Sequence, residues 1–399
     1  MTEVAGNLRA YRLSGIDMLR GLAVVFMALD HVRDFFLAGA ALDPMGDPNI
    51  QPALFMTRWI THFCAPVFVL LAGTSAGLMA ARKTPSALGS FLLTRGLWLI
   101  MVEWFVIATA FTFAPGGLTE YDQRTLVLMQ VIWAIGASMV VLAAAQFLGR
   151  AWCLVIGLTI VCGHNLLDSI WPVVGLSETS APLWVALHSQ MAAVAGPFMF
   201  IFIYPLLPWV GVMLLGYGSA GAFELPAPSR DALLLRVGLT ITAAFFLIRA
   251  IDIYGDPNPW QLQTAGMMAT IIDFLNTTKY PPSLAFLLMT LGPAMLLGAF
   301  ADRITGKIKN ALVMFGRVPF AFYVAHFFLI HALSVVLGAT QGFDARQFLT
   351  IFSFYPSGYG LSLPGVYVVW VVVIMLLYPF CSWVAAVKAR RRDWWLSYL

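Results

Sequence analysis

The sequence has little charge for its length. Of its 399 residues, 11% are charged and 60% are hydrophobic, and the mean hydropathy is +0.84. A soluble chain carries about 25% charged residues, so this composition excludes a soluble globular protein and indicates a polytopic membrane protein. No short apolar segment with a small-residue cleavage site precedes the first long apolar stretch, and we expect no cleaved signal peptide.

Recognisable catalytic motifs and cysteines are also scarce. The sequence contains no phosphate-binding P-loop, no HExxH and no paired Cys-x-x-Cys, so nucleotide hydrolysis and metal chemistry have no positive support and we expect no metal ion. The net charge of +4 does not indicate nucleic acid, because the basic residues are spread over short loops. The cysteines all lie in apolar stretches, where we expect no disulfide framework: Cys64, Cys153, Cys162 and Cys381.

Long apolar stretches are what the sequence has in abundance. About ten of them reach the roughly twenty residues that a helix needs to cross a bilayer. We therefore predict an all-α, polytopic membrane protein with one transmembrane domain over residues 1–399. The predicted spans are 15–38, 55–80, 89–113, 124–147, 152–172, 198–221, 232–254, 281–301, 310–337 and 364–387.

Lysine and arginine predict the orientation in the membrane. One side of the predicted topology carries fourteen of these residues and the other side three. Because positive residues concentrate in cytoplasmic loops, we expect both termini in the cytoplasm, as tails over residues 1–12 and 388–399. The fourteen are Arg9, Arg12, Arg82, Lys83, Arg150, Arg230, Arg236, Arg303, Lys307, Lys309, Lys388, Arg390, Arg391 and Arg392; the three are Arg124, Lys279 and Arg346.

The first predicted span is interrupted by charge. Helical residues advance about 100° and 1.5 Å each, so one stripe collects Asp17, Arg20, Val24, Met27, His31 and Asp34. Arg20 and His31 are roughly 16 Å apart along that stripe. Ionisable groups in a span cost about 2.5–3.5 kcal/mol each and usually line a protein interior or an aqueous path. The stripe favours a functional surface over a structural seam, whereas Asp30 and Arg33, off the stripe, are expected to form a local ion pair.

Other predicted spans carry isolated polar residues. Arg95 lies in the third span, Arg317 opens the ninth, and His326 lies in the middle of the ninth beside Tyr323. Histidine suits acid–base chemistry near neutral pH, and arginine binds two oxygens of an anion such as phosphate. The histidines all fall in the predicted outer half of the protein: His31, His62, His164, His188, His326 and His331. For His62, a structural role at the interface and a site role remain equally open.

Several segments resemble one known family. The runs RLSGIDMLRGLAVVFMALDHVRDFF and FMTRWITHFCAPVFVLLAGTSAGL are similar to the bacterial branch of the heparan-alpha-glucosaminide N-acetyltransferase catalytic-domain family, which belongs with the acyltransferase-three proteins in the transmembrane acyltransferase superfamily. Further matching runs are TRGLWLIMVEWFV, YPLLPWVGVMLLGYG, FLNTTKYPPSLAFLLMTLGP and FGRVPFAFYVAHFFLIH. The resemblance covers nearly the whole chain and is specific for the family rather than for a substrate.

The resemblance implies transfer of an acyl group, usually acetyl, from cytoplasmic acyl-CoA to an extracytoplasmic glycan or small-molecule acceptor. Acyltransferase-three proteins share an arginine followed, after ten residues, by a histidine, here Arg20 and His31. We therefore expect Arg20, with Arg95 and Arg317, to bind acyl-CoA. The bilayer and acyl-CoA are the expected partners, and a bacterial inner membrane is the expected location.

One departure from the family changes the expected mechanism. The lysosomal enzyme has an essential histidine before its second span, but NIQPALFMTRWITHFCAP has none at the matching place, so an acetyl-histidine mechanism does not carry over. We expect direct attack by the acceptor, with His31 as general base and with His62 and Asp34 in supporting catalytic roles. The acceptor-side candidates are Asp30, Arg58, His326 and Tyr323, and Arg58 or an ordered water is expected to donate to the thioester oxygen.

Two other functions fit the same residues. Buried charges also mark the path of a transporter or flippase for an envelope precursor, with a proton-coupled route. A non-catalytic envelope scaffold is the third interpretation. Binding of acyl-CoA separates the enzyme from both. The sequence determines neither the acceptor nor whether oxygen or nitrogen is acylated.

Overall fold

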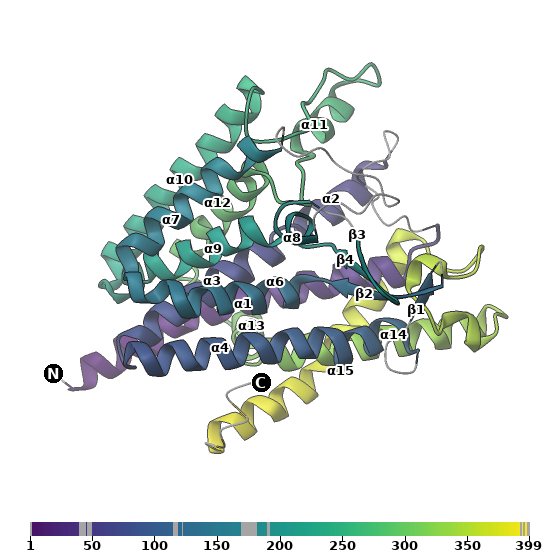
Figure 1. Ribbon diagram of the computed structural model, residues 1–399. Helices are drawn as coiled ribbons and strands as arrows, with labels where there is room; N and C mark the ends of the chain where they lie inside the picture. Colours follow the sequence, from purple (N-terminus) through teal and green to yellow (C-terminus); the bar gives the residue numbers. More distant parts are fainter. Residues whose placement is uncertain are drawn as a thin grey trace. The chain divides into compact units, whose positions relative to one another are not determined.

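The helical membrane class is confirmed by the computed structural model, which is 75% helical and shown in Figure 1. The structure describes residues 2–39, 45, 50–114, 119–121, 123–168, 182–189, 192–391, 393 and 396. Part of the predicted C-terminal tail, 388–399, lies outside these residues, while the predicted N-terminal tail is helical from Thr2. The positions of the termini relative to the membrane stay a prediction.

Helices make up most of the described residues, which also include four short strands. In chain order the helices and strands are α1 (Thr2–Phe36), α2 (Pro52–Thr61), α3 (Cys64–Ala80), α4 (Pro85–Val102), α5 (Ala108–Thr112), β1 (Thr119–Tyr121), β2 (Arg124–Met129), α6 (Val131–Ala145), α7 (Arg150–Gly163), α8 (Pro182–Leu187), β3 (Ala192–Ala195), β4 (Phe198–Phe202), α9 (Leu206–Gly218), α10 (Ala227–Ile251), α11 (Met267–Leu275), α12 (Leu284–Phe300), α13 (Lys307–Arg317), α14 (Pro319–Thr340) and α15 (Leu363–Arg390).

Eight helical stretches in the described part of the chain are long and apolar enough to cross a membrane. They correspond to eight of the ten predicted spans. The other two predicted spans are 15–38 and 281–301. The first corresponds to α1, which carries the charges of the stripe, and the second corresponds to α12, which has 17 residues. A count of ten spans therefore stays a prediction.

Three predicted spans differ from the structure in their detail. The segments 124–147 and 198–221 begin as the strands β2 and β4, and only their second halves are helical. A six-residue apolar run reads the same in a strand as in a helix. The span 310–337 is two helices, α13 and α14, because Pro319 begins α14 in its first turn.

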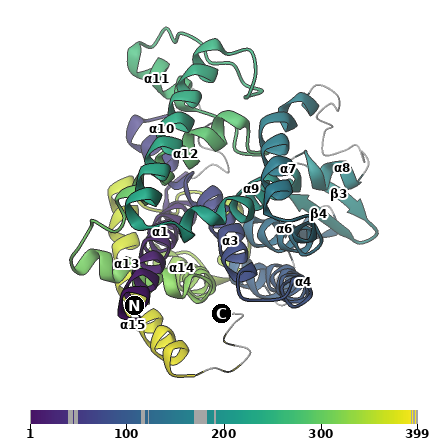
Figure 2. The same ribbon diagram turned by 90° about the vertical axis from the view of Figure 1, so that its left-hand side faces the viewer.

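The chain divides into two compact units, and the prediction of a single domain stays a prediction. The first unit comprises residues 1–13, 65–103 and 126–303. Within it α10 packs against α12, α4 against α6, and α7 against α9; the last pair lies side by side in Figures 1 and 2. β3 pairs antiparallel with β4, Ala192 opposite Ile201.

Glycines allow close helix contacts in the first unit. A Cβ atom on Gly96 would lie 2.5 Å from the carbonyl oxygen of Gly136, and one on Gly136 would lie 2.7 Å from that of Gly96. Small residues let membrane helices approach backbone to backbone, where van der Waals contact replaces a hydrophobic driving force. These two glycines therefore bring α4 and α6 together.

The second unit comprises residues 14–64, 104–125 and 304–399. In it α14 contacts α5 and α15, and α13 also packs on α15. α1 is tied to α15 by Trp370, whose indole N–H donates to the carbonyl of Val25 at 2.9 Å. α2 is tied to α15 by Thr57 and Tyr367, whose hydroxyl oxygens are 2.8 Å apart.

Replacing Gly316 by alanine is expected to destabilise the second unit. The added Cβ would lie 1.7 Å from the backbone oxygen of Asp17, so α13 would have to move away from α1, at a cost of about 1–3 kcal/mol or more. Thermal unfolding of the purified variant measures this loss. Gly163→Ala is the control, because nothing lies within 4 Å of its added Cβ. Equal melting temperatures for the two variants would contradict the close contact.

Candidate functional site

Asp30 forms the centre of a buried ion network between α1 and α2. Arg58 donates from Nη1 to Asp30 Oδ2, and Arg33 Nη1 lies 3.0 Å from Oδ1. Thr61 donates its hydroxyl to the same Oδ1 at 2.8 Å. All four residues are at most 9% exposed. The predicted Asp30–Arg33 ion pair is confirmed, and Arg58 and Thr61 join it from the second helix.

The network extends to the end of α1. Arg33 also donates from Nη2 to Asp34. Two carboxylates, on Asp30 and Asp34, therefore face two guanidinium groups, on Arg33 and Arg58. Charges removed from water are tolerated when they are paired and hydrogen-bonded, so this neutral set can be buried.

His31 and His326 form a histidine pair next to this network. Their ring centroids are 5.2 Å apart, and the ring of Phe327 lies 4.3 Å from His31 and 4.5 Å from His326. His31 Nδ1 lies 3.8 Å from Asp34 Oδ2. The structure thus brings together a predicted general base, a carboxylate predicted to support it and a predicted acceptor-side histidine from α14.

Hydrogen bonding sets which nitrogen of His326 carries the proton. The ring is fully buried, and Nδ1 faces the backbone carbonyls of Phe322, at 3.3 Å, and of Tyr323. A carbonyl only accepts, so Nδ1 carries the hydrogen and the neutral ring presents a lone pair at Nε2. Nε2 is buried and has no hydrogen-bond partner among the described residues. His326 can therefore accept a proton or a hydrogen bond from a ligand.

Aromatic rings surround the histidine pair. Phe111 lies 5.6 Å from Phe327 and 5.7 Å from Phe35, both edge-on. Tyr323, predicted beside His326, has its ring 5.5 Å from it and is 4% exposed. Apolar rings beside the two imidazoles make their surroundings less polar and strengthen the polar contacts there.

His331 has a structural role in the described contacts. Its Nδ1 lies 2.9 Å from the carbonyl oxygen of Ala110, and its Nε2 lies 2.7 Å from that of Phe348. Its ring stacks on Phe113 at 3.8 Å with an interplanar angle of 6°. His331 thereby connects α14 to the end of α5 and to the segment that follows α14.

Two tyrosines near His331 were not predicted from the sequence. Tyr355 and Ser334 share a hydrogen bond of 3.0 Å, and Tyr359 donates to the backbone oxygen of Phe35 at 3.0 Å. Burial raises the pKa of both phenols above the ordinary value, so they remain protonated donors. No motif or spacing marks them, because their partners lie on other helices.

The Asp17 cluster occupies the other end of the charged stripe. Arg20 Nη1 lies 3.3 Å from Asp17 Oδ1, and Arg317 Nε lies 3.9 Å from Oδ2. Lys388 donates to the backbone oxygen of Arg317 at 3.5 Å. The Arg317 side chain is 65% exposed. Two of the predicted acyl-CoA-binding arginines, Arg20 and Arg317, therefore lie beside the same carboxylate.

His62 lies at the end of α2, and Arg95 lies on α4. His62 is buried and forms the C-cap of α2, directly after Thr61, with its backbone N–H donating to Trp59. Arg95 lies half-buried on α4, in the first unit. Nine of the ten predicted site residues thus belong to the second unit.

The first unit has a histidine pair of its own. His188 donates from Nε2 to the backbone oxygen of His164 at 2.9 Å and lies 3.5 Å from Asp168 Oδ1. The two imidazole centroids are 5.6 Å apart. Within the described ranges, no group of three or more His, Cys, Asp or Glu side chains is arranged to hold a metal ion.

Two glycine patterns in the first unit have packing roles. Residues 73–77 read GTSAG and residues 216–221 read GYGSAG, which match the GxSxG and GxGxxG patterns. Ser75 lies within α3 and donates to the carbonyl of Leu71 at 2.6 Å, so it is not exposed on a strand-to-helix turn. Cβ atoms on Gly73 and Gly216 would each lie 2.1 Å from a backbone oxygen of the facing helix. The glycines of these two patterns therefore let the backbones of α3 and α9 pack closely together.

Replacing Asp30 by asparagine is expected to destabilise the protein strongly. The change leaves Arg33 and Arg58 buried without their shared carboxylate, and breaking a buried pair costs about 3–5 kcal/mol. The free energy of unfolding, measured by denaturant titration in detergent, reports the loss. Glu224→Gln is the control, because its pair with Arg150 is 30–41% exposed and is worth about 0–1 kcal/mol. Similar losses in both variants would contradict a central role for Asp30.

Residues 12–254, more than half of the chain, match the family described as heparan-alpha-glucosaminide N-acetyltransferase, catalytic. The match includes Asp30, His31 and Arg58 and ends before α14, which carries His326. Among curated proteins, none matches the chain significantly.

Proposed function

Because the chain belongs to the heparan-alpha-glucosaminide N-acetyltransferase catalytic family, we propose that it is a membrane acyltransferase that takes an acetyl group from cytoplasmic acetyl-CoA. The acceptor is an extracytoplasmic glycan, amino sugar or related small molecule, and the membrane is a bacterial inner membrane. The observation that carries the proposal is that α1 holds Arg20, in the Asp17 cluster, near its middle and His31, in the histidine pair, near its C-terminal end.

The Asp17 cluster supports binding of the donor. Arg20 and Arg317 both lie beside the Asp17 carboxylate, and Lys388 hydrogen-bonds to the backbone of Arg317, so an anionic ligand at this end of the stripe would meet several positively charged side chains. A guanidinium fork binds two phosphate oxygens at once. We assign Arg20 and Arg317 to the phosphates of CoA, and Arg95 remains a further candidate of the first unit.

The length of α1 supports the position of the thioester. Arg20 and His31 are separated by roughly 16 Å along the helix axis, comparable to an extended pantetheine arm. CoA phosphate at Arg20 would therefore place the acyl carbon near the histidine pair. The aromatic rings around His31 and His326 would keep water from hydrolysing the thioester.

His31 is assigned as the general base. It takes the proton of the acceptor hydroxyl or amine while the acceptor oxygen or nitrogen bonds to the acyl carbon. The thioester C–S bond breaks and CoA leaves as the thiolate. Asp34, 3.8 Å from His31 Nδ1, favours the imidazolium that forms. His326 accepts a hydrogen bond from the acceptor through Nε2, and His62 assists.

Asp30, Arg58 and Tyr323 remain on the acceptor side of the proposed site. Asp30 and Arg58 have a positioning role, because their ion pair holds α2 against α1 next to His31. Tyr323 orients His326 through its backbone carbonyl.

A transporter or flippase is the second candidate function. The observation that favours it is the buried Nε2 lone pair of His326 next to His31, which suits a proton path as well as a reaction. A carrier exchanges its substrate across the membrane without releasing CoA, so an assay of free thiol separates the two functions.

Acetyl-CoA is expected to stabilise the purified protein, and Arg20→Ala is expected to abolish this effect. A ligand at one hundred times its dissociation constant adds about 2.7 kcal/mol to stability, which a thermal shift measures. Arg236→Ala, an exposed arginine on the same predicted side, is the matched control and should keep the stabilisation. Absence of stabilisation in the wild type would reject acetyl-CoA as the donor.

His31→Ala is expected to keep the stabilisation by acetyl-CoA and to lose turnover. Removal of a general base lowers the rate about 10²–10⁴-fold. Release of free CoA thiol, measured with a panel of amino sugars that includes glucosamine, reports the rate. Retained binding serves as the folding control. Wild-type turnover in His31→Ala would contradict the assignment of the base.

A further inference from the structure

The segment that follows α10 exposes several large apolar side chains. Ile253, Leu262, Met267, Met268 and Ile271 are 42–86% exposed. Single exposed hydrophobic residues are ordinary on a protein surface, but five within nineteen residues form a patch that requires an explanation. Three of them belong to α11, and all nine of its residues keep at least part of their surface exposed.

The segment is held rigidly to the end of α10. Arg249, which is 2% exposed, donates to the carbonyl oxygens of Asn258 at 2.8 Å, Phe274 at 2.9 Å and Asp273 at 3.1 Å. The carboxylate of Asp273 accepts from the backbone N–H of Gln261 at 2.8 Å. The exposed apolar face therefore belongs to an ordered element.

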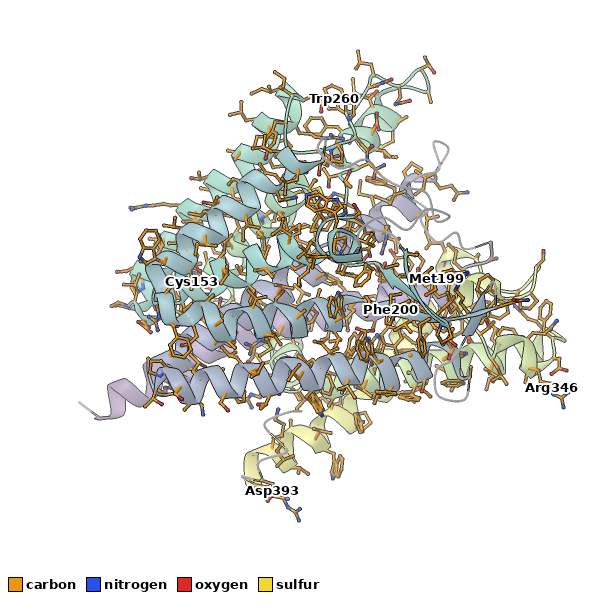
Figure 3. All side chains as sticks on the ribbon, viewed as in Figure 1. Cys153, Met199, Phe200, Trp260, Arg346 and Asp393 are labelled. Carbon is orange, nitrogen blue, oxygen red and sulfur yellow. The ribbon has the colours of Figure 1, made fainter. Side chains whose placement is uncertain are left out.

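Contacts between aromatic rings fix the position of α11 along the axis of α10. Phe274, near the end of α11, stacks on Phe246 with centroids 6.2 Å apart and an interplanar angle of 16°. Trp260 contacts Phe274 at 5.3 Å and lies at this end of the first unit in Figure 3. Phe246 precedes the last residue of α10, Ile251, by five positions, or about 8 Å along the helix. α10 is one of the candidate membrane spans. The end of α11, which packs on Phe246, therefore lies nearer the centre of the membrane than the last residue of α10 does.

We propose that α11 and the preceding turn lie in the interfacial layer of the bilayer, with Leu262, Met267, Met268 and Ile271 buried among lipid chains. The occupant of this face is lipid because the face continues the exposed apolar surface of α10, where Leu247 is 61% exposed. A short helix with one apolar face suits this position.

Hydrophobic burial, and not charge, drives this insertion. Residues 253–278 contain no lysine or arginine, so attraction to anionic lipid contributes little. The two acidic residues of the segment, Asp256 and Asp273, accept hydrogen bonds from the chain itself. Insertion of α11 into the bilayer does not depend on the proposed transferase activity.

Spin-label accessibility in reconstituted bilayers tests the proposal. Met268→Cys is labelled in a Cys162→Ala background, because Cys162 is exposed. Leu247→Cys, on the exposed face of α10, is the lipid reference, and Lys83→Cys, in the exposed turn after α3, is the aqueous reference. We expect the label at residue 268 to collide more with oxygen than with a water-soluble nickel chelate, as at residue 247. Accessibility like that at residue 83 would overturn the proposal and favour a water-exposed cap or a protein partner.

A second measurement varies the lipid. The depth of the label at residue 268 is expected to be unchanged between pure phosphatidylcholine and a mixture with phosphatidylglycerol. Insertion that requires phosphatidylglycerol would overturn the hydrophobic explanation. All the labelled positions are exposed in the described structure, so the labels displace no core side chain.

Discussion

The second unit depends on one constraint, which is that charges carried into an apolar helix bundle must be neutralised by close neighbours. The carboxylate of Asp30 is neutralised by Arg33 from its own helix and by Arg58 from α2. A lone charge in such surroundings would cost several kcal/mol, so the network permits only arrangements that keep these contacts. The residue after Asp30 is His31, and the same network therefore sets where its imidazole meets α14.

Close backbone packing has a comparable effect at the other end of the stripe. Gly21 and Gly316 leave no room for a Cβ atom between α1 and α13. This contact places Arg317, the residue after Gly316, beside the carboxylate of Asp17 and hence beside Arg20. The cluster of cations proposed to bind the donor is thus a consequence of glycine packing as much as of charge.

Particular residues show where reasoning from the sequence was sufficient. The Asp30–Arg33 pair followed from three-residue spacing on one helix, and the contact of Tyr323 with His326 followed from the same spacing. Residues 124–129 and 198–202 were read as helical and are strands, because hydropathy does not distinguish short apolar runs. Tyr355 and Tyr359 were missed, because no local pattern marks a residue whose partners come from other helices.

By itself, the sequence determined the membrane class, most of the long helices and the charged stripe on α1. These properties depend on composition and on residues within a few turns of one another. Only the tertiary structure decided that Arg58 meets Asp30 across 28 positions and that His326 meets His31. The physical reason is that apolar helices present similar faces, so the choice of neighbours is made by packing and charge pairing in three dimensions.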